Sequence, residues 1–163
     1  MGIAGLGEAH TYGGVMAKQF PHFYEGEVEW TEQKKGKLTS AGLPALEVAT
    51  PPEFQGHEEM WSPEQYFLAS VNACFMTTFL AISEMSKLEF VSFSSKARGK
   101  LDKVEGQVPQ VTEITLRPRL VTRYARDLER ARRILEKAEK NCFISNSIKS
   151  HVTLDPELLR AEE

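Results

Sequence analysis

An apolar stretch covers residues 66–82, and a strong helix-start signal precedes it. The serine of this signal is a favourable N-cap, the proline suits the first helical position, and the glutamine can close a capping box. The two aromatic residues have the spacing of a hydrophobic staple. We therefore predict a helix over about residues 63–86. The signal consists of Trp61, Ser62, Pro63, Gln65 and Tyr66.

This helix is apolar on nearly every side, which places it in a protein core or at a subunit interface. It is short for a membrane span, and polar residues such as Asn72 and Thr77 interrupt it. The remaining chain offers too little material to cover it completely. We therefore expect a partner subunit to bury part of its surface.

Alternating apolar and polar positions predict strands elsewhere. Before the helix, three short strands are expected at residues 22–30, 36–41 and 45–50, with loops at Gly26, Gly36 and residues 42–44. After it, a hairpin of residues 90–104 and 111–122 is expected to turn at residues 106–109.

The two hairpin strands each have a predicted inward face. Pro118 cannot donate a backbone hydrogen bond, so the second strand should be an edge strand or contain a bulge there. The inward residues are expected to be Val91, Phe93, Ala97 and Leu101 on the first strand, and Ile114, Leu116 and Leu120 on the second.

Residues 124–140 form an amphipathic pattern, with Leu128 and Leu135 on the apolar stripe that continues to Cys142. A final strand at residues 151–154 should be stopped by Pro156. The order of strands, buried helix, hairpin, second helix and strand predicts an α+β fold.

Length and composition are those of one soluble globular domain, residues 1–163. The net charge of −3 offers no general case for nucleic-acid binding. Two cysteines are too few for a secreted disulfide scaffold, so we expect a reducing, cytoplasmic location. Residues 1–20 lack the basic and apolar regions of a signal peptide and read as an N-terminal extension.

Candidate chemistry centres on Cys74 within the apolar helix. A buried cysteine usually serves only as a small apolar residue. The same alternative holds for Cys142, which continues the apolar stripe of the second helix. Glu64, at the helix start, has an ordinary role there as a negative charge near the positive end of the helix dipole.

Two motifs resemble the OsmC/Ohr family of thiol-dependent hydroperoxide reductases. The first is Ser62-Pro63-Glu64-Gln65 followed by Ala73-Cys74-Phe75. The second runs from Glu139 through Cys142 and Ser145 to Lys149, and is followed by the strand Val152-Thr153-Leu154. Residues 99–102 of the hairpin are also similar, and the resemblance covers roughly residues 20–158.

The resemblance implies an intertwined homodimer whose antiparallel sheets wrap around buried central helices, with active sites at the subunit interface. It also implies that Cys74 attacks an organic hydroperoxide and becomes a sulfenic acid, which Cys142 converts to a disulfide. An external dithiol, of the lipoyl type in one branch of the family, would reduce that disulfide. No metal or other cofactor is implied.

In the family, an arginine from the N-terminal strands stabilises the thiolate, and the residue matching Glu64 holds that arginine. Ten residues of helix rise about 15 Å, so Glu64 cannot touch Cys74 of the same helix and must act through a bridging group or across the interface. This sequence has no arginine before Arg98. Lys34, Lys35 and Lys37 are the cations in the corresponding region.

The absent arginine keeps a second hypothesis open, namely an OsmC-like protein that binds a small molecule and is not a peroxidase. A third interpretation concerns a basic patch on the hairpin. No aromatic residues are interleaved with these charges, so we expect no nucleic-acid binding. We expect no membrane partner either, because polar residues interrupt the apolar helix. The patch would consist of Lys96, Arg98, Lys100, Arg117, Arg119 and Arg123.

Overall fold

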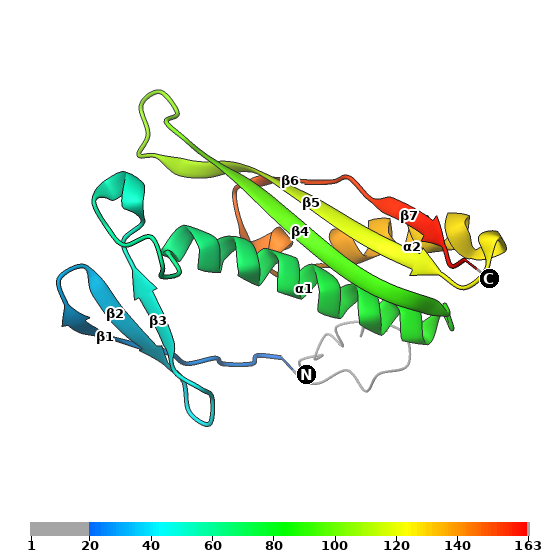
Figure 1. The fold of residues 1–163 in the computed structure, drawn as a ribbon, viewed down its shortest axis with the longest axis horizontal. Helices are drawn as coiled ribbons and strands as arrows, with labels where there is room; N and C mark the ends of the chain where they lie inside the picture. Colours follow the sequence, from blue (N-terminus) through cyan, green and yellow to red (C-terminus); the bar gives the residue numbers. More distant parts are fainter. Residues whose placement is uncertain (1–19, 163) are drawn as a thin grey trace, which may run out of the picture.

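The computed structural model describes residues 20–162. The predicted N-terminal extension therefore lies, except for Phe20, outside the described residues. Two sheets and two principal helices make up the fold, in which α1 (Pro63–Met85) lies between a small N-terminal sheet and a larger C-terminal sheet (Figure 1). This arrangement confirms the predicted α+β class.

The N-terminal sheet contains β1 (Glu27–Glu32), β2 (Lys35–Thr39) and β3 (Leu46–Ala49), which pair antiparallel in that order. The prediction of a loop at Gly36 was wrong, because Gly36 is buried within β2 and lies opposite Trp30. The turn lies instead at Gln33, which has a positive φ of 47°.

The start of α1 agrees with the sequence prediction. Gln65 N–H donates to Ser62 Oγ at 3.2 Å, and Ser62 N–H donates to Gln65 Oε1 at 2.8 Å, so the capping box is complete. The rings of Trp61 and Tyr66 stack with centroids 5.3 Å apart.

Hydrogen bonds attach this end of α1 to the N-terminal sheet. Tyr66 Oη donates to the Glu47 carbonyl at 2.7 Å, and Ala49 N–H donates to the Trp61 carbonyl at 3.0 Å. The first turn of α1, which carries Glu64, is therefore held beside β3.

The C-terminal sheet is mixed, which corrects the expectation of purely antiparallel sheets. The strands β4 (Phe90–Asp102) and β5 (Gln110–Thr122) pair antiparallel, whereas β6 (His151–Leu154) and β7 (Glu157–Arg160) pair with β5 in parallel. The parallel direction follows from the crossover through α2 (Leu128–Lys140).

Pro156 ends β6 as predicted, but the chain then returns to the same side of β5 as β7, a strand that the sequence reading missed. The expectation that Pro118 marks an edge strand was also wrong. Pro118 is buried in the central strand β5, at the place where its parallel neighbour changes from β6 to β7. Residue 118 has no partner on that side, so its missing N–H breaks no ladder hydrogen bond there.

Two register shifts change the predicted inward face of β4. One lies between Phe90 and Ser92 and the other between Lys100 and Leu101. As a result Phe90 and Phe93 pack against the core, whereas Val91 is 57% exposed and Leu101 is 44% exposed, contrary to prediction. The predicted inward residues of β5 are all fully buried, namely Ile114, Leu116 and Leu120.

The core fills the space between α1, α2 and the C-terminal sheet. From α2, the buried stripe predicted from the sequence is present, with Ala131, Leu135 and Ala138 all fully buried. From α1, Val71, Phe75 and Phe79 contribute, and Phe79 stacks on Phe93 with centroids 4.6 Å apart.

The opposite face of α1 is uncovered within one chain. Ala73 is exposed, and Met76 and Leu80 are 38% and 41% exposed. Among residues 20–162, α1 is the only helix that is long and apolar enough to cross a membrane. In the structure, 28% of its most apolar window is buried. The central helix of a soluble protein meets the same criteria of length and composition.

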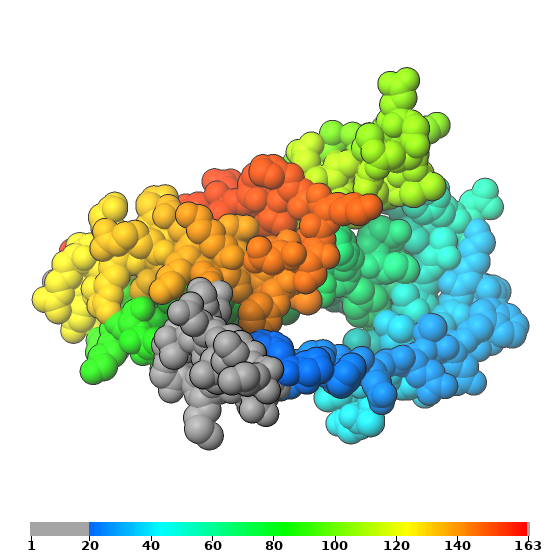
Figure 2. All heavy atoms as spheres, turned by 180° about the vertical axis from the view of Figure 1, so that it is seen from behind, coloured from blue at the N-terminus to red at the C-terminus, as the bar shows by residue number. Residues whose placement is uncertain are grey.

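The N-terminal sheet projects from the rest of the molecule beside the start of α1, and a gap separates its lower part from the C-terminal half in the view from behind (Figure 2). Residues 23–27 and 39–41 line an open hollow of about 1020 Å³. Aromatic side chains in this region are strongly exposed, among them Phe23 at 85%, Tyr24 at 93% and Trp30 at 72%.

Candidate functional site

Cys142 lies just beyond the end of α2 and is fully buried. Its position follows from the apolar stripe of α2, which points into the core and brings the next inward residue against α1. The Cys142 sulfur lies 4.0 Å from the Val71 carbonyl oxygen, toward which the thiol is directed, on the central helix. Cys142 therefore connects the end of α2 to α1.

Cys74 stands one helical turn after Val71 and is half-buried. Its side chain contributes to the electrostatic surroundings of Cys142, so the two thiols are neighbours. Both thiols are free. The structure therefore brings together two cysteines that are distant in the sequence, one accessible in part and the other enclosed.

The electrostatics of Cys142 have opposing contributions. Burial raises the pKa of the Cys142 thiol, because a thiolate is poorly solvated in the core. The side chain and backbone N–H of Ser145 lower this pKa, and the hydrogen bond and charge of Cys74 raise it. Cys142 is therefore mainly a thiol at neutral pH, with one local feature that favours ionisation.

Sequence reasoning did not single out Ser145, although the Cys-x-x-Ser spacing was visible. Ser145 begins the short 3₁₀ turn η3 (Ser145–Ser147), and its N–H donates to the Cys142 sulfur at 3.5 Å. The turn is held by Asn146, whose Nδ2 donates to the Cys142 carbonyl at 2.8 Å.

Glu64 lies in the first turn of α1 and is not brought to Cys74 within the chain. Its Oε2 atom is buried and has no hydrogen-bond partner among residues 20–162. A buried carboxylate oxygen without a donor is costly, so this atom is suited to a donor supplied from outside the described part of one chain.

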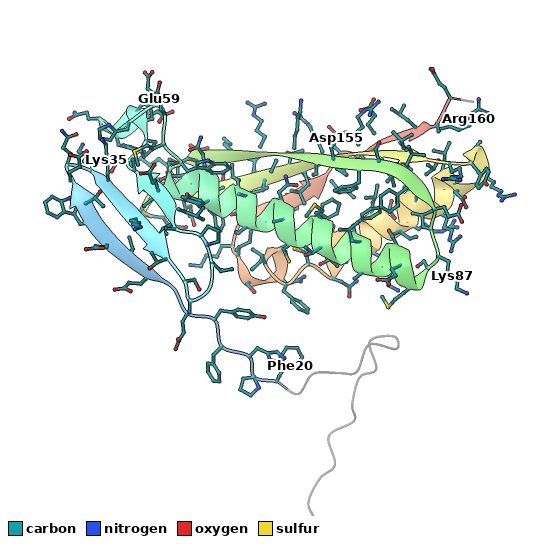
Figure 3. All side chains as sticks on the ribbon, turned by 60° about the horizontal axis from the view of Figure 1, so that its bottom comes forward. Phe20, Lys35, Glu59, Lys87, Asp155 and Arg160 are labelled. Atoms are coloured by element: carbon teal, nitrogen blue, oxygen red, sulfur yellow. The ribbon has the colours of Figure 1, made fainter. Side chains whose placement is uncertain are left out.

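The three candidate lysines differ in their surroundings. Lys34 Nζ donates to the Phe54 carbonyl at 2.8 Å, and Lys35 pairs with Glu32 at 2.9 Å. Lys37 is exposed on β2, and within the described part of the chain it forms no ion pair. Figure 3 shows Lys35 at the far end of the N-terminal sheet from Phe20.

The predicted basic patch is partly neutralised. Arg117 pairs with Asp155 at 3.2 Å, Arg119 with Glu157 at 3.3 Å, and Lys100 with Asp102 at 2.7 Å. Asp155 and Glu157 flank Pro156, so the acidic partners of Arg117 and Arg119 come from the β6–β7 junction. The outward face of the C-terminal sheet is consequently of mixed charge.

Comparisons with known proteins agree with this architecture. Residues 56–157 match the family model described as OsmC-like protein. The uncharacterized protein YmaD of Bacillus subtilis is 28% identical over 141 residues, which cover 83% of this chain and 92% of that protein.

Among solved structures, an OsmC-like protein of unknown function from Vibrio cholerae has a TM-score of 0.77 at 22% identity, covering 83% of this chain and 99% of its own. An organic hydroperoxide resistance protein from Elizabethkingia anophelis has a TM-score of 0.70 at 19% identity, covering 88% of this chain and all of its own. With its central helix, its pair of sheets and its matched family model, this chain belongs to the OsmC-like protein family.

Proposed function

We propose that this protein is a thiol-dependent peroxidase that reduces organic hydroperoxides to alcohols. The observation that carries the proposal is the proximity of a half-buried Cys74 to a fully buried Cys142, whose sulfur lies 4.0 Å from the carbonyl oxygen of Val71, one helical turn before Cys74. Membership of a family that includes organic hydroperoxide resistance proteins supports it.

The reaction uses the two sulfurs in turn. The Cys74 thiolate attacks the peroxide O–O bond, forms an S–O bond, and releases an alkoxide that takes up a proton to become the alcohol. Cys142 then attacks the Cys74 sulfenic acid, and the disulfide forms as water leaves. An external dithiol restores both thiols and is itself oxidised to a disulfide, a requirement that fits a cytoplasmic location.

We assign Glu64 the role of holding a cation beside the thiolate of a partner subunit. The buried and unpaired Oε2 atom supports this role, since a positive donor would satisfy it. A carboxylate alone would raise the pKa of a nearby thiol, so the cation has to stand between the two groups. Within the described part of its own chain, Lys37 is the candidate that makes neither an ion pair nor a side-chain hydrogen bond, whereas Lys35 pairs with Glu32 and Lys34 donates to the Phe54 carbonyl.

The working form in this proposal is a homodimer. One chain leaves the apolar face of α1 exposed, and the N-terminal sheet holds an open hollow beside its exposed aromatics. A second copy would cover both surfaces and bring the Glu64 of one subunit toward the cysteines of the other.

The proposal is tested by following cumene hydroperoxide consumption with dihydrolipoate as the reductant. We expect turnover in the unmodified protein, none with Cys74→Ser, and normal turnover with Arg132→Ala, an exposed change on α2. Turnover that survives in Cys74→Ser would refute the assigned nucleophile, and no turnover in the unmodified protein would refute the peroxidase.

A further inference from the structure

The turn that follows α2 places the N–H and the buried hydroxyl of one serine beside one buried sulfur. Cys142 is fully buried, and Ser145 N–H donates to its sulfur at 3.5 Å. The Ser145 hydroxyl is also buried, and within residues 20–162 it makes no hydrogen bond of regular geometry. The Ser145 side chain nevertheless acts to lower the pKa of Cys142.

A hydroxyl in this position responds to the charge of the sulfur. A neutral thiol is a weak acceptor, so it offers little to a buried hydroxyl. A thiolate is a charged acceptor, and hydrogen bonds to charged groups are about twice as strong as neutral ones. The Ser145 hydroxyl is therefore unsatisfied while Cys142 is protonated, and it gains a partner when Cys142 ionises.

We propose that Ser145 is a thiolate-stabilising residue that favours Cys142 as the attacking sulfur during disulfide formation and as the leaving sulfur during disulfide reduction. This role of Ser145 in catalysis rests on the peroxidase cycle proposed above. In the first step Cys142 loses its proton, bonds to the Cys74 sulfur, and hydroxide leaves and takes up the proton as water. In the second, a dithiol bonds to Cys74 and Cys142 departs as the thiolate.

The difference in burial between the cysteines gives the second step its direction. Cys74 is half-buried and can be approached, whereas Cys142 is fully enclosed. An incoming dithiol therefore reaches the Cys74 sulfur, and the electron pair of the broken S–S bond is left on Cys142. Low leaving-group pKa speeds thiol–disulfide exchange, so a donor at Cys142 accelerates reduction.

The thiol itself is tested in a Cys74→Ser background, in which Cys142 is the only cysteine. With ¹³Cβ-labelled cysteine, the NMR shift of Cys142 is followed against pH for Ser145→Ala, Ser145→Thr and Ser147→Ala. Ser147 is the matched control, because its hydroxyl lies in the same turn but donates to the Phe143 carbonyl at 2.7 Å.

We expect Ser145→Ala to move the titration to higher pH, while Ser145→Thr and Ser147→Ala leave it in place. In the protein with both cysteines, Ser145→Ala should slow disulfide formation and dithiol reduction about ten-fold at neutral pH, the effect of losing one hydrogen bond to a charged group. Circular dichroism confirms that each variant is folded.

A Cys142 titration that is the same in Ser145→Ala and Ser147→Ala would overturn the inference. So would equal slowing by the two variants, which indicates a general effect on the turn. These thiol measurements need no peroxide turnover, so they separate this inference from the proposed function. Absence of turnover in the unmodified protein refutes the peroxidase. A Cys142 titration that Ser145→Ala leaves unchanged refutes only the role of Ser145.

Discussion

The Cys142 sulfur lies 4.0 Å from the carbonyl oxygen of Val71, although the two residues are 71 positions apart in the chain. This contact places the end of α2 against the turn of α1 that leads to Cys74. Because Cys142 has no exposed surface, the pair of thiols is open to the outside only through Cys74. The relationship determines what the site can do and how it can be tested.

One equivalent of cumene hydroperoxide should convert the two free thiols into a Cys74–Cys142 disulfide. Intact-protein mass spectrometry will show the loss of two hydrogens, because the chain has only these two cysteines. With Cys142→Ala, Cys74 should instead remain a sulfenic acid that dimedone traps. A mixture of intermolecular dimers without the intramolecular bond would contradict the geometry.

Glu64→Gln should reduce kcat/KM for hydroperoxide about ten-fold or more, because a neutral amide holds a cation less well than a carboxylate does. Glu84→Gln, at an exposed site near the other end of α1, serves as the control. Equal activity of the two variants would remove Glu64 from the site.

Ala73→Glu should convert the proposed homodimer to a monomer, because it introduces a charge in the middle of the exposed apolar face of α1. Analytical ultracentrifugation measures the change. Arg132→Glu, on the exposed side of α2, should leave the assembly intact. A monomeric unmodified protein, or a dimer that survives Ala73→Glu, would contradict the assigned interface.

Gly56→Ala should destabilise the loop that joins β3 to α1. An added Cβ would stand 1.6 Å from the Thr50 carbonyl oxygen, so the backbone itself has to move. We expect a loss of about 3 kcal/mol in urea unfolding, as for a severe overpacking change. Gly106→Ala, which meets no atom within 4 Å but has a φ of 74°, should cost about 1 kcal/mol. Similar losses of unfolding free energy in Gly56→Ala and Gly106→Ala would show that the backbone around Gly56 moves at little cost.

Stability should fall as pH rises into the alkaline range. Burial holds the pKa of Cys142 above its ordinary value of 9.0, so above that value the unfolded chain loses a proton that the folded chain keeps. The folded state thus becomes less stable between the unfolded and folded pKa values and is unaffected below them. Urea unfolding from pH 7 to 10 should show a shallower decline in Cys142→Ala, and identical slopes would contradict the effect of burial.

Features that depend on neighbouring residues were predictable from the sequence. The capping box of Ser62 and Gln65 and the buried stripe of α2 rest on local spacing, and the structure contains both. The faces of β4 were not predictable at its ends, because the bulges beside Phe90 and Leu101 reverse the alternation there. Their positions depend on pairing with β5, which no local pattern records.

The site was predictable only in part. Its cysteines and glutamate were identified through resemblance to a family, but composition and spacing alone did not establish that Cys74 and Cys142 meet. That contact depends on how α2 packs across α1, a long-range event. The donor at Ser145 was visible only as a spacing, since its relation to the sulfur requires the 3₁₀ turn.

The way in which β6 and β7 share one side of β5 has a consequence for biosynthesis. Until both short strands have left the ribosome, one side of the long strand β5 has unpaired backbone groups. A nascent chain halted after α2 would expose that row to other polypeptides. Completion of the larger sheet is therefore a late event in the life of the newly made polypeptide, when chaperone protection matters most.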